Sequence, residues 1–314
     1  MNSIPTEAGV NRHQIKPELT SFAVAIIAVN SALVGIPVVN YVLGILGVAC
    51  YPYLFVTERK NLAMVLAVGT LIIASIVSGL TGMFSLLLSV TLPGIAIGWA
   101  MKSDRTAGEA IILGFLPAFV IMLFFLINRA ELEAVLVLAI DEGIAQMTTL
   151  PGFLEDTESM QESLHSFGKT IFMIMPSLIL LSGLFNSFIG YLIASKILRK
   201  RDYEVPTIPH FTRWKPNYNL VWLFIAGLFI SVIGVEGTKA VGWNILVFTG
   251  IIYFVIGLAV VENFFMKAKM PVFFKILFYI GILFAQLFSL VVLAGVGLFD
   301  SWFNFRNRGS ATTV

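Results

Sequence analysis

Side chains that could carry out catalysis are scarce in this sequence and lie mostly outside its apolar stretches. His13, His165 and His210 fall in polar segments, and the single cysteine, Cys50, lies within an apolar run. The chain has no H-E-x-x-H or C-x-x-C pattern, no G-x-S-x-G motif and no G-x-x-x-x-G-K-[ST] phosphate-binding loop. We therefore predict a protein that is not an enzyme, that uses no metal or cofactor and that has no ATPase of its own.

One oppositely charged pair comes close to the pair of ionisable groups that an intramembrane enzyme would need. Glu262 and Lys275 are the ionisable residues that come closest to the interior of the apolar stretches. Both fall near the ends of predicted helices, where long charged side chains can reach the membrane interface. The interpretation that fits this position is an interfacial role for both residues, without catalysis.

Neutral polar side chains remain as the candidates for recognising a small molecule. A polar group in hydrocarbon needs a hydrogen-bond partner, which is either a neighbouring helix or a bound polar solute. The sequence leaves both alternatives open and predicts a small neutral solute if one binds. The substrate-binding candidates are Asn30, Asn40, Asn186, Tyr191, Asn244 and Gln286, of which Asn30 and Asn186 lie deepest in the predicted spans.

Other patterns could bring helices or partner proteins together. Ala28-x-x-x-Ala32 permits close approach of another helix, and we take both alanines as candidates for docking a partner. Gly183-x-x-x-Ser187 is a similar pattern, which we expect to serve packing within the chain. Phe211 and Trp214 belong to a basic, proline-rich loop over residues 196–216, which should attract anionic lipid or dock a cytoplasmic partner.

Composition shows what must position these residues. Of 314 residues, 58% are hydrophobic and only 12% are charged, and the mean hydropathy is +0.92. Soluble domains usually carry about 25% charged residues, so much of this surface must face lipid. The net charge of +2 gives no footprint for nucleic acid. We therefore predict an all-α, polytopic bundle of transmembrane helices in contact with the bilayer.

The apolar stretches can be divided into helices because one span needs about 20 residues. Gly79-Leu80-Thr81-Gly82 offers a turn within one long stretch, and Pro93, Pro117 and Pro176 should bend the helices that contain them. Nine helices are expected, over residues 19–35, 38–57, 61–78, 82–101, 110–128, 170–195, 218–235, 241–262 and 272–298.

The remaining segments complete the organisation. Residues 1–18 form a polar segment before the bundle, which spans 19–298, and residues 299–314 form a tail. The segment 129–169 is acidic, and Leu132, Val135, Leu136, Ala139 and Ile140 recur at helical spacing, which predicts an amphipathic external helix. Beyond Pro151-Gly152, the Ser159-x-x-Glu162 pattern predicts the start of another short helix.

The distribution of basic residues predicts the sidedness of the loops. Lys and Arg concentrate in loops 58–60, 102–109, 196–216 and 262–275, which should be cytoplasmic together with the N-terminus. Nine helices then leave the C-terminus outside, yet Arg306 and Arg308 favour the cytoplasm. Eight helices is the alternative that removes this conflict, and the sequence leaves the choice open.

The segments around residue 200 and at the C-terminus carry a family resemblance. Met175-Pro176-Ser177-Leu178, then Phe185-Asn186-Ser187-Phe188 and Arg199-Lys200-Arg201, resemble the YybS-like bacterial membrane proteins, a family of unknown function. The same holds for Pro209-x-Phe211-x-x-Trp214 and for the tail Asp300-Ser301-Trp302-Phe303-Asn304-Phe305-Arg306, where the family pattern has aspartate at the position of Asn304.

The resemblance also suggests a function and a location. The family is distantly similar to the substrate-binding S subunits of energy-coupling-factor transporters, which dock through an A-x-x-x-A pattern like Ala28-x-x-x-Ala32. This implies a solute-binding or transport subunit in the bacterial inner membrane, working with a separate ATPase and a coupling membrane subunit. The alternative is a membrane scaffold without transport activity that docks partners through loop 196–216.

Overall fold

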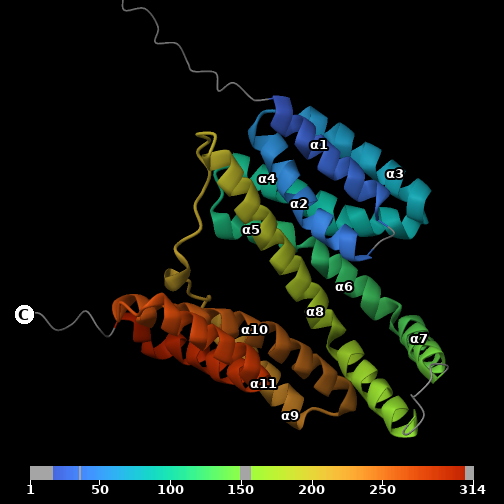
Figure 1. Ribbon diagram of the computed structural model, residues 1–314, viewed down its shortest axis with the longest axis vertical. Coiled ribbons are helices and arrows are strands. Elements are labelled where there is room, and N and C mark those ends of the chain that lie inside the picture. Colours follow the sequence, from blue (N-terminus) through green and yellow to red (C-terminus); the bar gives the residue numbers. More distant parts are fainter. Residues whose placement is uncertain (1–16, 35–36, 149–156, 308–314) are drawn as a thin grey trace, which may run out of the picture. The chain divides into compact units, whose positions relative to one another are not determined.

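The computed structural model describes residues 17–34, 37–148 and 157–307 (Figure 1). Within these residues all regular structure is helical, which confirms the predicted all-α class. In chain order the elements are α1 (Pro17–Ala32), α2 (Pro37–Val56), α3 (Lys60–Leu86), the π-helical turn η1 (Leu87–Thr91), α4 (Leu92–Lys102), α5 (Ala107–Phe115), α6 (Pro117–Ile127), α7 (Arg129–Thr148), α8 (Thr157–Arg199), the 3-10 turn η2 (Phe211–Arg213), α9 (Asn219–Ile233), α10 (Glu236–Lys267), α11 (Val272–Phe303) and the 3-10 turn η3 (Phe305–Asn307).

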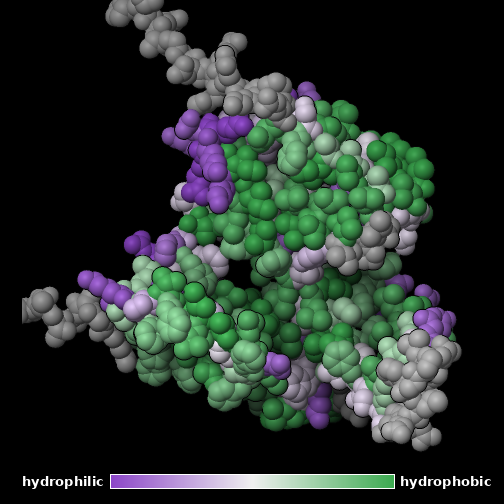
Figure 2. All heavy atoms as spheres, in the orientation of Figure 1, coloured by the Kyte–Doolittle hydropathy of each residue, from purple (hydrophilic) through white to green (hydrophobic). Residues whose placement is uncertain are grey.

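The described helices have the length and composition of membrane spans. Apolar side chains cover most of the surface in view, and hydrophilic residues gather in small patches (Figure 2). Two shorter apolar helices cover Leu19–Ala32 and Asn219–Ile233. Six longer segments among the described residues are apolar enough to cross a membrane: Val39–Val56, Lys60–Lys102, Ala107–Ile127, Ser159–Arg199, Gly237–Lys267 and Val272–Phe303. The chain is therefore a multi-pass membrane protein in contact with lipid.

The chain divides into two compact units, which we describe separately. The first unit comprises residues 1–120 and 182–208, and the second comprises residues 121–181 and 209–314. The long helix α8 contributes to both, its residues before 182 to the second unit and those after to the first. The main core of the first unit is formed by large buried side chains such as Tyr51, Leu54 and Ile97.

Helix α3 reverses direction within the first unit. Ser78 and Gly79 leave the helical conformation, and Gly79 adopts φ 67°, which glycine tolerates because it has no Cβ. A Cβ added to Gly82 would lie 3.2 Å from the carbonyl oxygen of Ala74, eight residues earlier, so the chain folds back tightly. The predicted turn at residues 79–82 is confirmed. With this turn, and with α5 and α6 counted together, the described residues contain the nine expected apolar segments.

Small residues set the packing of α8 against α5 and α6 in the first unit. Gly183 faces Ala118, and a Cβ added to Gly114 would lie 3.1 Å from Oγ of Ser187. Gly114-x-x-x-Ala118 and Gly183-x-x-x-Ser187 therefore cross face to face, which lets the two backbones approach. The prediction that Gly183-x-x-x-Ser187 packs within the chain is confirmed.

In the second unit α7 packs along the beginning of α8. Nε2 of His165 lies 2.9 Å from Oδ1 of Asp141, and Gly168 faces Ile140. The predicted separate short helix near Ser159 is wrong, because Thr157 already begins α8, which continues without interruption to Arg199. Of the apolar positions of α7, Val135 and Ala139 are exposed while Ile140 and Ile144 face inward, so the interfacial position of this helix stays a prediction. The break expected at 151–152 lies outside the described residues.

Helix α11 is the second element that folds back on itself. Gln286 has φ 41° and ψ −116°, which interrupts the helix, and Oγ of Ser289 donates to the carbonyl of Ile282, seven residues earlier, at 3.0 Å. Near its start, Lys275 pairs with Glu262 of α10. Beyond its end, the carbonyl of Arg306 accepts a bond from Lys267, also on α10. A straight helix could not bring both of its ends to the same end of α10, so α11 is a hairpin.

The two arms of this hairpin are short. Residues 272–285 and 287–303 would measure roughly 21 and 25 Å at the helical rise of about 1.5 Å per residue. The hydrocarbon core of a bilayer is about 30 Å thick, so α11 has the dimensions of a re-entrant hairpin. The predicted helix over 272–298 therefore exists but folds back, so that both of its ends lie at the same end of α10. A re-entrant α11 would remove the conflict between nine apolar segments and the basic tail.

We predict that the α10–α11 turn and the tail are exposed on the same side of the membrane. In a Cys50→Ala background, Lys269→Cys and Asn307→Cys should react with a membrane-impermeant maleimide from one side. Gly237→Cys, at the other end of α10, should react from the opposite side and serves as the control. Labelling of positions 269 and 307 from opposite sides would show that α11 crosses the membrane once.

Candidate functional site

The π-helical turn η1 is the most unusual backbone feature of the first unit. In an α-helix the carbonyl of Ser89 would accept a bond from the amide of residue 93, but that residue is Pro93, which has no N–H. Nδ2 of Asn186 on α8 donates to this carbonyl at 2.6 Å. π-helical turns interrupt helices rarely and occur often at functional sites. Asn186 therefore connects α8 to a carbonyl that Pro93 leaves without its α-helical donor.

Buried oxygen atoms without a hydrogen-bond partner lie around this turn. They are Oδ1 of Asn186, Oγ of Ser187 and Oδ1 of Asn30, whose residue is only 1% exposed. Gly47 on α2 is a neighbour of both Asn30 and η1. A Cβ added to Gly47 would lie 2.8 Å from the side chain of Val90, which belongs to η1, and 3.7 Å from Nδ2 of Asn30 on α1. A buried acceptor left without a donor costs about 1–3 kcal/mol. A molecule with donor groups would satisfy these oxygen atoms.

Asn244 occupies a different kind of position, in the second unit. Pro176 disturbs α8, and the amide of Ser177 donates to Oδ1 of Asn244 at 2.8 Å. Nδ2 of Asn244 donates to the carbonyl of Met173 at 2.7 Å and to that of Ala240 at 2.8 Å. One side-chain amide thus bonds both the amide of Ser177 and the carbonyl of Met173, the two groups that an α-helix pairs with each other. Asn244 stabilises the contact between α8 and α10 in the described structure.

The remaining solute candidates have separate surroundings. The hydroxyl of Tyr191 donates to the carbonyl of Pro206 within the first unit. Oδ1 of Asn40 is buried without a partner on α2, and Gln286 is exposed where α11 reverses. The structure places Asn30, Asn40, Asn186 and Tyr191 in the first unit, and Asn244 and Gln286 in the second. Among these candidates, Asn186 bonds η1 and Asn30 lies close to it.

The alanines proposed for docking lie at the surface of α1. Ala28 is half-buried and Ala32 is exposed. Phe22 and Val29 on the same helix are also exposed, at 65% and 47%. A partner helix could reach this surface, so the docking prediction for Ala28 and Ala32 stays a prediction.

Phe211 and Trp214 are held within the second unit. Their rings meet edge to face with centroids 5.1 Å apart, and Nε1 of Trp214 donates to the carbonyl of Pro209 at 2.8 Å. Both residues are half-buried. The P-x-F-x-x-W segment thus forms a compact turn around η2, stabilised by its own contacts. The docking prediction for Phe211 and Trp214 stays a prediction.

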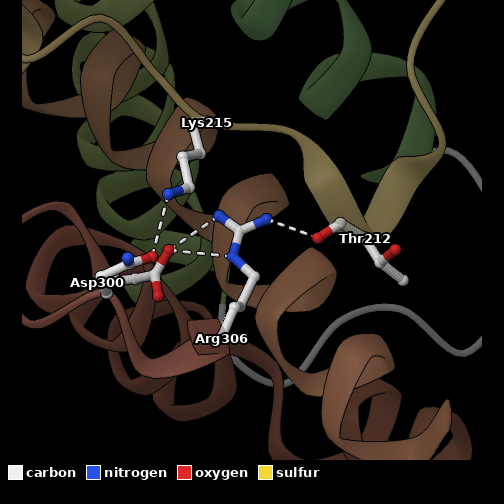
Figure 3. A network of polar contacts seen from close by, with 5 residues as sticks. Thr212, Lys215, Asp300 and Arg306 are labelled. Carbon is white, nitrogen blue, oxygen red and sulfur yellow. Dashed lines mark hydrogen bonds and ion pairs between the residues drawn. The ribbon is translucent and has the colours of Figure 1, made fainter. Parts of the chain in front are cut away.

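The carbonyl of Thr212 in this turn connects η2 to the C-terminal tail. Nη1 of Arg306 donates to it at 2.7 Å, while Nη2 and Nε of Arg306 donate to Oδ2 of Asp300 at 2.7 and 3.0 Å (Figure 3). The side chains of Arg306 and Asp300 are 4% and 2% exposed. The pair is therefore almost fully removed from solvent. In such a place each charge is stabilised by the other, and removing one of them would leave the other buried without a partner. We call Thr212, Asp300, Arg306 and their bonded neighbours the tail clamp.

Two lysines complete the tail clamp. Asn304 ends α11 in the left-handed conformation, and its Oδ1 accepts a bond from Nζ of Lys215 at 2.9 Å. Nζ of Lys267 donates to the carbonyl of Arg306. An aspartate at position 304, as in the family pattern, would accept the same bond from Lys215 with an added charge attraction. The P-x-F-x-x-W segment and the C-terminal tail, which both carry the family resemblance, therefore bind each other.

Some of these residues were missed by reasoning from sequence. Asp300 was noted as part of the tail motif, and Arg306 as part of that motif and as a basic residue of the tail. Their pairing was not expected, because a separation of six residues does not place them on one helical face. The signal that could have revealed them is a charge pair next to an apolar helix end. Glu262 and Lys275, which were considered, form a half-buried ion pair at 2.6 Å joined by the hydroxyl of Tyr279.

The sequence matches the family described as "Predicted membrane protein (DUF2232)" over residues 22–301. A curated relative, "Uncharacterized protein YybS" of Bacillus subtilis, is 23% identical over 274 residues, which cover 82% of this chain and 86% of that protein. No solved structure matches the chain. The expected resemblance to YybS-like proteins is confirmed, while the similarity to energy-coupling-factor subunits stays a prediction.

Proposed function

We propose, from the premise that this chain belongs to the DUF2232 family of predicted membrane proteins, that it binds a small neutral polar solute within its first unit. The observation that carries the proposal is the pair of acceptor oxygens of Asn30 and Asn186, buried beside the π-helical turn without donors. A solute with hydroxyl or amide N–H groups would supply those donors. Ser187, whose hydroxyl also has no partner, could donate to or accept from the same solute.

The groups identified around η1 in the described part of the chain are neutral, which supports a neutral solute. They are the amides of Asn30 and Asn186 and the hydroxyls of Thr91 and Ser187. A charged solute in this surrounding would have to lose its hydration without gaining a counter-charge, which is strongly unfavourable. A neutral molecule with several hydrogen-bond donors avoids that cost.

The chain would then serve as a solute-binding or transport subunit of a bacterial uptake system. Because its sequence contains no ATPase motif, uphill movement of the solute would need an ion gradient or a separate ATPase with its coupling membrane subunit. The distant similarity to S subunits favours the second source. The basic residues in loops 58–60, 102–109 and 196–216 favour the inner membrane with the N-terminus in the cytoplasm.

The binding step can be tested on the purified protein. Native mass spectrometry after release from a mild detergent should show a low-mass adduct on the wild-type chain. Asn30→Leu should lose the adduct because it removes an acceptor, and so should Asn186→Leu. Asn128→Leu serves as the matched control, because Asn128 is an amide at the exposed end of α6 and bonds the carbonyl of Phe124.

Two outcomes would contradict the proposal. One is a folded wild-type protein without any adduct after purification from its native membranes. The other is an adduct that survives in both Asn30→Leu and Asn186→Leu. Asn186→Leu also removes the hydrogen bond that Nδ2 of Asn186 donates to the carbonyl of Ser89. Thermal stability must therefore be measured in parallel, to separate a loss of binding from a loss of folding. Co-purification of an ATPase and a second membrane subunit would support the transport role specifically.

A further inference from the structure

Four exposed cations gather around the tail clamp of the second unit. Lys215 bonds Asn304, and Lys267 bonds the carbonyl of Arg306. Arg213 follows Thr212, whose carbonyl is bonded by Arg306, and Lys269 lies in the turn directly after α10. All four side chains are exposed. We call Arg213, Lys215, Lys267 and Lys269 the basic cluster.

The acidic residues nearby are already used by other cations. Asp300 is bound by Arg306, and Glu262 is bound by Lys275. Across the described ranges 17–34, 37–148 and 157–307, no ion pair reaches any member of the basic cluster. The cluster therefore presents four positive charges on one end of the unit with no carboxylate to balance them.

Lipid-facing side chains continue directly from this cluster. Lys215 is followed by Tyr218 and Trp222 at the start of α9, which are 52% and 60% exposed. Lys269 is followed by Val272 and Phe273 at the start of α11, 68% and 69% exposed. Both helices begin here, so the positive ends of their dipoles add to the field of the cluster. A charge cluster that joins exposed apolar surface lies at the depth of phospholipid headgroups.

We propose that the basic cluster binds the phosphate headgroup of an anionic phospholipid, with its acyl chains along the exposed apolar beginnings of α9 and α11. The phosphate balances charges that the protein leaves uncompensated, and the acyl chains cover Trp222 and Phe273. A soluble anion would balance the charges but would leave these apolar side chains uncovered. The site is independent of the proposed solute site, since all its residues belong to the second unit.

The test is lipid binding by delipidated, full-length protein in a mild detergent. Phosphatidylglycerol should bind and raise the thermal midpoint, whereas phosphatidylcholine and inorganic phosphate should have little effect. Arg213→Gln/Lys269→Gln removes two charges without touching the hydrogen bonds of the tail clamp, and it should weaken phosphatidylglycerol binding by about tenfold or more. Adding Lys215→Gln and Lys267→Gln should weaken it further.

The control is Lys200→Gln/Arg201→Gln, which removes two basic residues from the first unit and should leave binding unchanged. Equal binding of the two lipids would overturn the proposal, as would wild-type affinity in Arg213→Gln/Lys269→Gln. An equal loss in the control would show attraction to total charge without a site. Competition by inorganic phosphate alone would assign the cluster to a soluble anion and contradict the lipid.

Discussion

Replacing Arg306 by glutamine should lower the free energy of unfolding by about 3–5 kcal/mol, the cost of removing one partner from a buried ion pair. Asp300 would keep its charge at 2% exposure with no cation beside it, and the carbonyl of Thr212 would lose its donor. Asp300→Asn should also destabilise the second unit, because it leaves the charge of Arg306 buried without a counter-charge. Unfolding of the purified protein in mixed micelles, followed by circular dichroism, measures the change.

An exposed ion pair provides the matched control for this experiment. Nζ of Lys102 lies 2.6 Å from Glu58, as close as the buried pair, but both side chains are exposed. Lys102→Gln should therefore cost less than about 1 kcal/mol. The double variant Asp300→Leu/Arg306→Leu should recover much of the loss because no buried charge remains. If Arg306→Gln costs no more than Lys102→Gln, the pair is not buried in the membrane-bound protein.

Adding one methyl group to Gly297 should destabilise the α10–α11 contact by about 1–3 kcal/mol. Its Cβ would meet the carbonyl oxygen of Tyr253, and a Cβ on Gly257 would meet that of Leu293, so backbone atoms would have to separate. Such close approach through small residues is a principal source of attraction between helices in lipid. Gly297→Ala and Gly257→Ala can be compared by the same unfolding measurement.

A neighbouring glycine distinguishes packing from helix propensity. A Cβ added to Gly295 meets nothing within 4 Å. Alanine favours a helix over glycine by about 1 kcal/mol, so Gly295→Ala should be neutral or stabilising. Opposite signs at positions 295 and 297 are the expected result. Equal effects at the two positions would mean that α11 does not contact α10 as described.

Much of the helical layout follows from residue types alone. Apolar length located the spans, Gly79 located the reversal in α3, and Pro117 located the break between α5 and α6. The fold-back of α11 could not be found this way, because Gln286 is neither glycine nor proline and the apolar character is similar on both sides. Hydropathy reports that a segment prefers lipid, but it carries no information about its direction.

The candidate site shows a similar division. The sequence identified Asn186 and Asn244 as polar residues in lipid, and Pro93 and Pro176 as disturbances of helices. It could not say that each asparagine bonds backbone atoms near a proline, because that pairing depends on how helices far apart in the chain meet. The tail clamp was likewise visible as two motifs, while the bond between them required the folded structure.

Asn244, which bonds the backbone of α8 on both sides of Pro176, also sets an order of events during synthesis. Asn244 is 67 residues beyond Ser177. At about 5–20 residues per second, a ribosome needs on the order of 3–13 s to add that length. During this interval α8 has emerged without the two bonds that Asn244 makes to Ser177 and Met173. The later arrival of α10 supplies them, so this part of α8 gains its side-chain partner only after a different helix has been made.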